Sequence, residues 1–320
     1  MFVCYDIGGT NIKAGLVEPN GVVRARVSVP TPVNSRPDEF LQLLADVRTR
    51  LCINSKIAIS AITAVGLGIP GFLDMESGKV RQAVNLGWRD EPIVELARQK
   101  LGDPVYILND ANAAALGEAW RGAGQNIPDL LCVTLGTGVG GGTITNGKIV
   151  SGHLNFAGEI GHMCVRPDGG RVCGCGAVGC LETEASATAL GMYGTEAASS
   201  GVSPMLVHVM RESGRITAYD VVQAAKEGDL QAKIIIERMA YYLGYGLANA
   251  YTVTAPARIV IGGGVAAAGR VLFDPLTHFF DRFIFSKEVR GQELIVPAFL
   301  GNDAGIIGLA RWIQTSESSK

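Results

Sequence analysis

The residues best suited to chemistry lie in the segment from Glu159 to Glu182. This segment holds one histidine and three cysteines whose side chains can supply an imidazole and three thiolates, the tetrahedral set that structural Zn²⁺ takes. Glycines between them would let the backbone fold tightly around an ion. Four protein ligands leave no open position on a metal, so we expect a structural Zn²⁺ and not a catalytic one. The predicted ligands are His162, Cys173, Cys175 and Cys180.

The two ends of this segment carry Glu159 and Glu182, which a closed metal site would hold near one another and near His162. Such a cluster suits sugar hydroxyl groups, and each polar group that pairs with a hydroxyl discriminates against ligands that lack it. His162 could bind the metal through one ring nitrogen and the sugar through the other, in which case the metal would fix its tautomer. Cys164, two residues past His162, is an alternative metal ligand.

Two glycine turns follow apolar strands. Asp6 ends the first strand, and a glycine turn follows whose backbone amides can point at phosphate oxygens. One such turn is weak evidence, because any tight hairpin can use glycine. A second turn, 136–138, follows the apolar stretch 130–135, and this repetition favours a phosphate site. An Asn-Gly pair, a hairpin signal, comes after each returning strand, at 20–21 and at 146–147.

Asp110 is the candidate catalytic residue. It lies between an expected strand over 105–108 and an expected helix. Phosphoryl transfer to a hydroxyl group needs a carboxylate that accepts the hydroxyl proton and aligns the oxygen. The alternative is that Asn109 and Asp110 only cap the helix. The same dipeptide recurs at Asn302-Asp303, where we expect only capping.

Several blocks repeat along the chain, which predicts an internal duplication. Gly68 corresponds to Gly262 at an offset of 194, and Asn109 to Asn302 at an offset of 193. The glycine turns repeat at a smaller offset of 128. The difference between the offsets predicts that the second half carries an insertion of about 65 residues, which contains the metal segment. Two strand-turn-strand units, each followed by helices and further strands, predict two α/β domains of related topology that face each other across a cleft.

Hydrophobic periodicity predicts helices over 37–52, 92–101, 203–213, 217–227 and 229–253, and a closing helix over 303–312. In the long helix over 229–253, a set of apolar residues is compatible with one buried side: Leu230, Ile234, Met239, Leu243 and Leu247.

The composition excludes several functional classes. The chain has 320 residues, 48% hydrophobic and 18% charged, with a net charge of −2, as expected for a globular protein with a large core. Lys and Arg are scattered, which argues against nucleic-acid binding, and no apolar stretch of 18 residues indicates a membrane span. The start resembles no signal peptide, so we expect a cytoplasmic protein. The remaining cysteines are interpreted as buried thiols in a reducing compartment: Cys4, Cys52, Cys132 and Cys164.

The blocks, in this order, resemble the ROK family of bacterial repressors, open reading frames and sugar kinases. The resemblance rests on D-I-G-G-T-N at 6–11, G-I-P-G at 68–71, N-D-A-N-A-A-A at 109–115, L-G-T-G-V-G-G-G at 135–142, the His-Cys segment and I-G-G-G at 261–264. It covers nearly the whole chain, and within the family the chain is most similar to the glucokinases.

The resemblance implies a two-domain actin-like ATPase fold, as in hexokinases. The first domain would be 1-118 plus 301-320, and the second 119-300 with the zinc segment 159-182. The closing helix would pack back on the first domain. The resemblance also implies ATP and Mg²⁺, with Asp6 near Mg²⁺ through water and a phosphate-binding set of Gly8, Gly9, Thr10, Asn11, Lys13, Gly136, Thr137 and Gly138. Lys13 could instead be a solvated lysine on an edge strand.

Two further sites follow from the resemblance. The adenosine would lie against Gly262, Gly263 and Gly264, although these glycines could equally form a crowded strand-to-helix turn. The sugar would be bound by Gly71, Asn109, Asp110, Glu159, His162 and Glu182.

The expected function is ATP-dependent phosphorylation of glucose to glucose 6-phosphate. One alternative is a kinase for N-acetylmannosamine, N-acetylglucosamine or fructose. A second is a sugar-sensing repressor, which would need a helix-turn-helix segment ahead of the strand that begins at Phe2. A third is a non-catalytic sugar-binding protein. Family members are commonly dimers or tetramers, so we expect a homo-oligomer; the apolar helices after residue 203 could supply its interface or be core.

Overall fold

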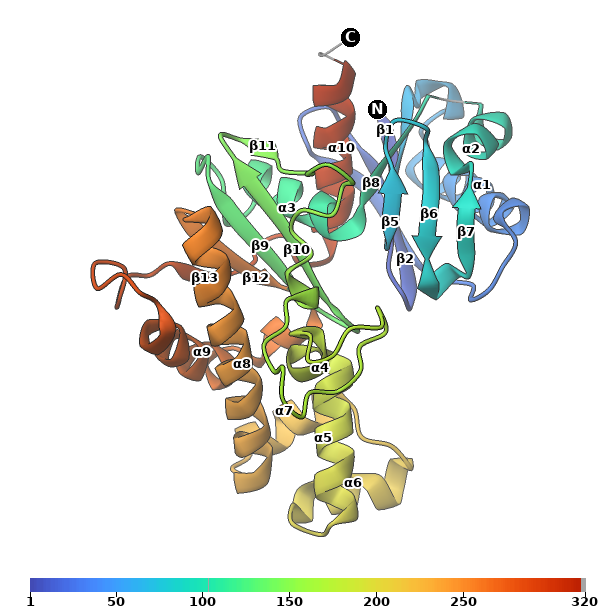
Figure 1. The fold of residues 1–320 in the computed structure, drawn as a ribbon. Helices are drawn as coiled ribbons and strands as arrows, with labels where there is room; N and C mark the ends of the chain where they lie inside the picture. The colour runs from blue at the N-terminus through green and yellow to red at the C-terminus, as the bar shows by residue number, and fades with distance from the viewer. Residues whose placement is uncertain (103, 318–320) are drawn as a thin grey trace. The chain divides into compact units, whose positions relative to one another are not determined.

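The computed structural model describes residues 1–102 and 104–317 (Figure 1). The chain divides into two compact units. The first unit comprises Met1–Cys132, Gly142–Gly158 and Phe299–Lys320, and the second comprises Val133–Gly141 and Glu159–Ala298. The domain ranges expected from the sequence stay a prediction; the units differ from them in assigning residues 119–132, 142–158 and 299–300 to the first unit.

The first unit is built on a sheet in the order β3-β2-β1-β4-β8. β1, β2 and β3 are antiparallel neighbours, whereas β4 and β8 continue the sheet in parallel with β1. β1 and β4 are apolar along almost their whole length because helices cover the sheet. The strands are β1 Phe2–Ile7, β2 Asn11–Val17, β3 Val23–Pro30, β4 Ala64–Ile69 and β8 Val105–Asn109.

A smaller antiparallel sheet, β5-β6-β7, extends the first unit; its strands are β5 Phe72–Asp74, β6 Lys79–Ala83 and β7 Trp88–Glu91. Trp88 anchors it, because its ring packs edge-on against Phe40 of α1 at 4.9 Å and its indole N–H donates to the Ser35 carbonyl at 3.0 Å. The helices beside it are α1 Pro37–Ser55 and α2 Ile93–Leu101, close to the predicted 37–52 and 92–101.

The second sheet has the order β11-β10-β9-β12-β13, which repeats the first sheet position for position. β9 and β10 correspond to β1 and β2, and β12 and β13 correspond to β4 and β8. This shared topology confirms the duplication expected from the sequence. The strands are β9 Leu130–Leu135, β10 Val139–Thr145, β11 Lys148–Ile149, β12 Arg258–Gly262 and β13 Ile295–Pro297.

One helix begins within the first Asn-Asp dipeptide and one directly after the second, and the two pack against each other: α3 Asp110–Arg121 and α10 Ala304–Glu317. Glycines make this contact possible. A Cβ at Gly117 would overlap the Ala304 carbonyl oxygen, and a Cβ at Gly308 would overlap the Ala113 carbonyl oxygen. The predicted closing helix is therefore confirmed, and α10 packs on α3, β1 and β4 of the first unit.

The second unit carries the helices α4 Glu182–Ala185, α5 Ala187–Ser199, α6 Pro204–Ser213, α7 Ala218–Lys226, α8 Leu230–Thr254 and α9 Arg270–Phe283. The predictions over 203–213, 217–227 and 229–253 are confirmed to within one residue. In each of the three, the first predicted residue is the N-cap, and its side chain accepts a backbone N–H; these residues are Ser203, Thr217 and Asp229.

The predicted buried side of α8 is partly wrong. Met239, Leu243 and Leu247 are buried, but Leu230 is 76% exposed and Ile234 is 54% exposed. The buried row in the first turns instead runs through Ala232, Ile235 and Ile236. The 3.6-residue period explains this result, because residues three and four before Met239 share its face and residue 234 does not.

Among the cysteines outside the metal segment's ligand set, Cys4, Cys52 and Cys132 are buried as expected. Cys164 is exposed, so its interpretation as a buried thiol is wrong. Its backbone pairs with that of Cys180 in an isolated antiparallel β-bridge, and its side chain is exposed to solvent.

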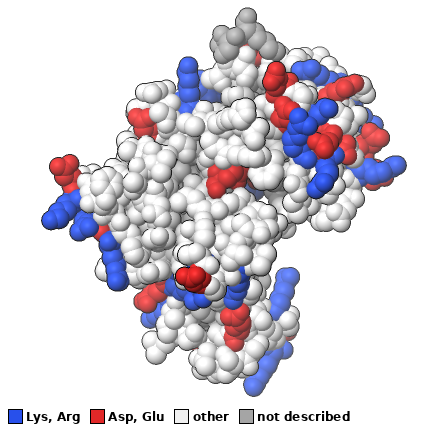
Figure 2. Space-filling model, in the orientation of Figure 1, with Lys and Arg blue, Asp and Glu red and all other residues white. Residues whose placement is uncertain are grey.

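On the face shown in Figure 2, Lys and Arg lie near Asp and Glu in several groups, and much of the surface between these groups carries no charged residue. Within residues 1–102 and 104–317, no helix is both long enough and apolar enough to cross a membrane.

Candidate functional site

The predicted metal ligands converge in the second unit. The donor atoms of His162, Cys173, Cys175 and Cys180 all lie within 4.8 Å of one another. Nδ1 of His162 is 3.6 Å from the Cys173 sulfur, and the sulfurs of Cys175 and Cys180 are 3.7 Å apart. A zinc tetrahedron with Zn–S bonds of about 2.3 Å has S–S edges of about 3.8 Å. Donor set and spacing therefore fit a structural Zn²⁺. The exposed Cys164, the alternative ligand, is not in this group.

Tight turns bring the ligands together. His162 ends the short 3₁₀ helix Ile160–His162. The Cys173 N–H donates to the Ala177 carbonyl at 2.7 Å, and the Gly176 N–H donates back to Cys173 at 2.9 Å. Gly176 has a φ of +90°, which glycine adopts without strain.

Burial raises the pKa of the Cys173 thiol and raises that of Cys180 to about 12. The Ala177 backbone N–H lowers the pKa of Cys175. A bound dication would favour all three thiolates.

A buried ion-pair cluster that the sequence did not reveal secures the metal segment. Glu184 is fully buried, and its carboxylate accepts from Arg166 at 3.1 Å, from Arg238 of α8 at 2.8 Å and from the Tyr193 hydroxyl at 2.5 Å. Burial acts to raise the pKa of Glu184, but the hydrogen bonds from Tyr193, Arg238 and Arg166 hold it below its usual value. The segment is thus fixed to α5 and α8 independently of a metal.

Glu159, His162 and Glu182 come together in the second unit, as predicted. Burial raises the pKa of Glu159, and the negative charge of Glu182 adds to this effect. Glu182 has a second set of contacts that the sequence did not predict. Its Oε2 accepts the Val139 backbone N–H at 3.0 Å, and its Oε1 lies 3.8 Å from the Cys173 sulfur.

The turn 136–138 is the second glycine turn. The Gly136 N–H donates to the Gly138 carbonyl at 3.0 Å. The Gly136 carbonyl accepts from the Ala187 N–H at 2.8 Å, and the Thr137 carbonyl accepts from the Thr188 hydroxyl at 2.7 Å. These bonds use the turn's carbonyl groups, so its amides can face a bound anion.

Gly262 is the last residue of β12, which neighbours β9 in the sheet, and Gly263 and Gly264 directly follow it. Gly263 has a φ of +87°, and a Cβ there would overlap Leu135, so this position is a crowded turn. Gly264 is exposed, and a Cβ there would meet no atom within 4 Å. Both interpretations of this stretch therefore have support: Gly263 is needed for packing, and Gly264 offers bare backbone.

The first glycine turn, in the first unit, joins β1 and β2. The Gly8 N–H donates to the Asn11 carbonyl at 3.0 Å. Thr31 fixes the turn from its own sheet, because its hydroxyl donates to the Gly8 carbonyl at 2.7 Å and its N–H donates to the Thr10 carbonyl at 2.9 Å. Gly9, Thr10 and Asn11 are exposed at its tip.

Asp6 lies beneath this turn, with Lys13 Nζ at 3.8 Å from its Oδ2 and Gly305 packed against its carboxylate. Burial raises the pKa of Asp6, and the positive charge of Lys13 opposes this effect. The edge-strand alternative for Lys13 is wrong, because β2 lies between β1 and β3.

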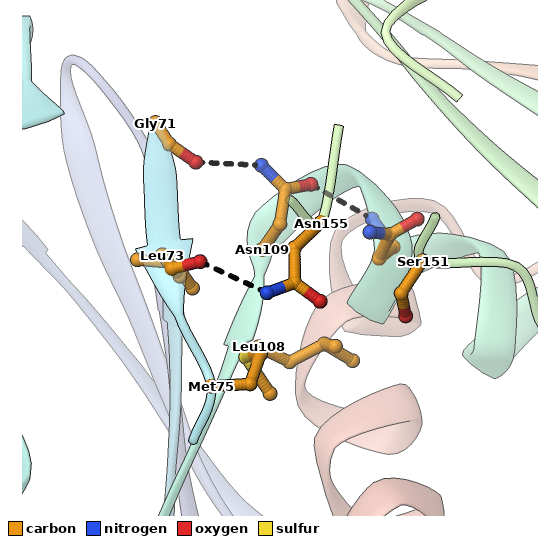
Figure 3. Close-up of a pocket in the computed structure, with 8 residues that line it drawn as sticks. Gly71, Leu73, Met75, Leu108, Asn109, Ser151 and Asn155 are labelled. Carbon is orange, nitrogen blue, oxygen red and sulfur yellow. Dashed lines mark hydrogen bonds between the residues drawn. The ribbon is translucent and has the colours of Figure 1, made fainter. Parts of the chain in front are cut away.

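Asn109 and Gly71 line a pocket in the first unit (Figure 3). The Asn109 side-chain amide donates to the Gly71 carbonyl at 3.4 Å, and its Oδ1 accepts the Asn112 N–H at 3.1 Å. Asn109 is therefore the N-cap of α3, while Asp110 is the first helical residue and its Oδ1 accepts the Ala111 N–H at 3.0 Å. The capping alternative is confirmed for Asn109.

Sequence reasoning missed the segment 151–156, which forms another wall of this pocket. Asn155 has a φ of +59°, and its amide donates to the Leu73 carbonyl at 3.1 Å (Figure 3). Phe156 packs on Phe72 with ring centroids 4.5 Å apart. Oδ1 of Asn112, which also lines the pocket, is buried and has no hydrogen-bond partner within the part of the chain described. The sequence feature that could have indicated this wall of the pocket is the largely polar run Ser-Gly-His-Leu-Asn at 151–155.

The repeated dipeptide Asn302-Asp303 differs from Asn109-Asp110. Asp303 accepts from Arg26 of β3 at 2.7 Å, and Leu300 is the N-cap residue of the 3₁₀ turn that leads into α10. Asp303 therefore acts in an ion pair and not as the expected helix cap.

Comparison with known proteins extends over nearly the whole chain. The family model described as "ROK family" matches residues 2–316. A glucokinase of Halalkalibacterium halodurans is 39% identical over 318 residues, which cover 99% of this chain and 96% of that protein. An N-acetyl-D-glucosamine kinase of Vibrio parahaemolyticus is 30% identical, with coverage of 97% and 98%. The crystal structure of a ROK family glucokinase from Streptomyces griseus, in complex with glucose and AMPPNP, superposes with a TM-score of 0.86 at 35% identity and coverage of 97% and 98%.

Proposed function

This chain belongs to the ROK family, and from that premise we propose that it transfers the γ-phosphoryl group of ATP to glucose, giving glucose 6-phosphate and ADP. The chain is a hexose kinase by its relatives, and its fold is that of the hexokinase-like sugar kinases. The observation that supports glucose is the similarity to glucokinases, one of which was crystallised with glucose and an ATP analogue.

Asp110 is the proposed general base. It begins α3 directly after β8, beside Asn109, whose side chain is oriented by Gly71 and by the helix N-terminus. A carboxylate at this position would accept the proton of the attacking sugar hydroxyl as the oxygen approaches the γ-phosphorus. Rigid neighbours suit this task, because small errors in the orientation of the hydroxyl slow the transfer.

The proposed sugar-binding residues are Gly71 and Asn109 of the first unit, with Asp110, and Glu159, His162 and Glu182 of the second unit. Glu159 and Glu182 would accept from sugar hydroxyls. His162 directs Nδ1 toward the thiolates, so Nε2 would donate to the sugar. A Zn²⁺ on Nδ1 would fix the tautomer that makes this donation possible.

The proposed phosphate-binding elements are the two glycine turns, with Thr10, Lys13 and Thr137. Asp6 would hold Mg²⁺, which would balance charge on the phosphates. The adenosine would lie against the exposed backbone at Gly264. Gly263 would hold this backbone against Leu135 of β9, and Gly262 packs closely against Ala298.

The second candidate function is phosphorylation of N-acetylglucosamine. The specific observation is the Vibrio parahaemolyticus N-acetyl-D-glucosamine kinase at 30% identity. This candidate shares the fold and the motifs, so the two differ only in the sugar that the pocket accepts.

The test is ADP release with ATP and Mg²⁺ across glucose, mannose, fructose, N-acetylglucosamine and N-acetylmannosamine. We expect the highest kcat/KM for glucose. A higher value for N-acetylglucosamine would replace the substrate and keep the reaction. Glucose binding without ADP release by folded, metal-loaded protein would favour a sensor or a non-catalytic sugar-binding protein.

A further inference from the structure

Both ends of the metal segment contact the residue that follows the second glycine turn. At the first end, Gly161, next to the ligand His162, packs so closely on Val139 that a Cβ would overlap the Val139 carbonyl oxygen. At the other end, Glu182 accepts the Val139 N–H at 3.0 Å. The peptide groups on either side of Val139 are therefore held between the two ends of one metal site.

Glu182 connects the turn to the metal ligands directly. It follows Cys180 by two residues, and its second oxygen is 3.8 Å from the Cys173 sulfur. The carboxylate lies so close to Gly138 that a Cβ there would overlap Oε2. A Cβ at position 138 would therefore displace this carboxylate from its present position.

Two residues that come after Glu182 in the chain also form hydrogen bonds with the turn. The Ala187 N–H and the Thr188 hydroxyl donate to the carbonyls of Gly136 and Thr137. Ser186 caps α5 by accepting the Ala189 N–H at 3.1 Å, which fixes the start of the helix that supplies both donors. The turn is consequently bound by consecutive residues of the chain that leaves the metal site.

We propose that the metal segment positions the nucleotide-phosphate turn, with Glu182 as the positioning residue that transmits the order of the metal site to residues 136–139. The proposal rests on the proposed function for one point, that this turn binds phosphate. Glu182 accepts the Val139 N–H, and the Gly136 N–H donates to the Gly138 carbonyl within the turn. The N–H groups of Thr137 and Gly138 are therefore the ones that would point at a phosphate. This role is separate from a contact of Glu182 with sugar.

The first experiment is calorimetric binding of AMPPNP with Mg²⁺ in the absence of sugar. We expect Glu182→Ala to weaken binding about tenfold, the effect of losing one hydrogen bond to a charged group. Glu182→Gln keeps an oxygen that can accept the Val139 N–H and removes a negative charge near the phosphate. It should bind AMPPNP within about twofold of wild type, or more tightly.

Glu196→Ala is the matched control. Glu196 is a carboxylate on α5 that pairs with Arg171 of the metal segment at 2.7 Å, and within residues 1–102 and 104–317 its side chain makes no hydrogen bond to the turn. Its removal should leave AMPPNP binding within about twofold, since an exposed ion pair contributes little.

The second experiment is amide hydrogen exchange of the peptide that contains residues 136–139, without any ligand. Glu182→Ala and Cys175→Ser should both speed exchange about tenfold, and Glu182→Gln should not. Chelation of the wild-type metal should speed exchange as well, and added Zn²⁺ should restore the original rate.

The outcomes separate the two proposals. Equal AMPPNP affinity of wild type and Glu182→Ala would overturn the inference. If wild type itself fails to bind AMPPNP, the proposed function fails. The exchange rate then decides alone whether the metal segment positions the turn, and an unchanged rate in both Glu182→Ala and Cys175→Ser would overturn that claim.

Discussion

The two glycine turns occupy equivalent positions in the two sheets, yet different parts of the chain hold them. The turn after β1 is fixed by Thr31, which directly follows β3 of the same sheet. The turn after β9 is fixed by Glu182, Ala187 and Thr188, which follow the metal ligands. The duplicated sheet therefore supplies the shape of both turns, and the insertion in the second half supplies a separate support for one of them.

The charges at the two turns differ as well. Asp6 and Lys13 form a pair beside the first turn, and the corresponding positions at the offset of 128 are Thr134 and Gly141. Only the first copy carries the acidic group that we assign to Mg²⁺. The two Asn-Asp dipeptides differ in the same way. Asp303 forms an ion pair with Arg26, whereas Asp110 is the first residue of α3, directly after β8. Equivalent backbone positions have thus taken different chemical roles.

The largest expected effect distinguishes the two Asn-Asp copies. Asp110→Asn should lower kcat about 10³-fold, because an amide cannot accept the hydroxyl proton, while glucose affinity stays within about threefold. Asp303→Asn removes an exposed ion pair with Arg26 and should keep kcat within about twofold. Steady-state ADP release and calorimetric glucose binding measure both. Retention of a tenth of wild-type kcat in Asp110→Asn would remove Asp110 as the base.

The next effect concerns the support that only the second turn has. Cys175→Ser should lose the metal, and glucose affinity should fall about 10- to 100-fold because His162 loses the group that orients it. Cys164→Ser is the matched control, since this exposed cysteine is outside the ligand group. Metal content per chain is measured by plasma emission. A full complement of metal in Cys175→Ser would mean that the ligand set is different.

The third effect tests the charge that only the first turn has. Because burial holds the pKa of Asp6 above its ordinary value, the folded protein binds this proton more tightly than the unfolded chain does. Ionised Asp6 therefore lowers the free energy of unfolding at pH values above its folded pKa, and Asp6→Asn removes that cost. We expect the Tm of Asp6→Asn to exceed that of wild type at about pH 8, with the difference shrinking as the pH falls through the folded pKa.

Activity should change in the opposite direction in this variant, with kcat about 10²-fold lower because the carboxylate proposed to hold Mg²⁺ through water is lost. Thermal unfolding over a pH series and ADP release at neutral pH measure the two effects. A Tm difference that is the same at every pH would contradict the role given to burial.

The smallest effect compares the two threonine hydroxyls, each of which donates to a turn carbonyl at 2.7 Å. Thr31 is 7% exposed, so Thr31→Val leaves the Gly8 carbonyl poorly hydrated and should lower the free energy of unfolding by about 1–2 kcal/mol. Thr188 is exposed, water can replace its hydroxyl, and Thr188→Val should cost about 0.5 kcal/mol or less. Denaturant unfolding measures both. An equal cost would show that burial does not distinguish the two anchors.

The sequence predicted the features that depend on local patterns. The helices that follow the caps Ser203, Thr217 and Asp229 lie within a residue of their predicted ranges, and the shared sheet order follows from repeated glycine blocks. The convergence of His162, Cys173, Cys175 and Cys180 was predictable because cysteine and histidine spacing is specific. Features that depend on contacts between distant residues were not predictable. Examples are the burial of Ile235 instead of Ile234, the Arg26–Asp303 pair, and the approach of Asn155 to Leu73.

The central claim is that this chain phosphorylates glucose with ATP, and product analysis tests it most directly. Wild-type protein, ATP and Mg²⁺ are incubated with glucose, and the products are identified by ³¹P NMR. The account predicts glucose 6-phosphate and ADP in equal amounts, with both formed about 10³-fold more slowly when Asp110→Asn replaces wild type. ADP formed without a sugar phosphate, or no product from folded and metal-loaded protein, would contradict it.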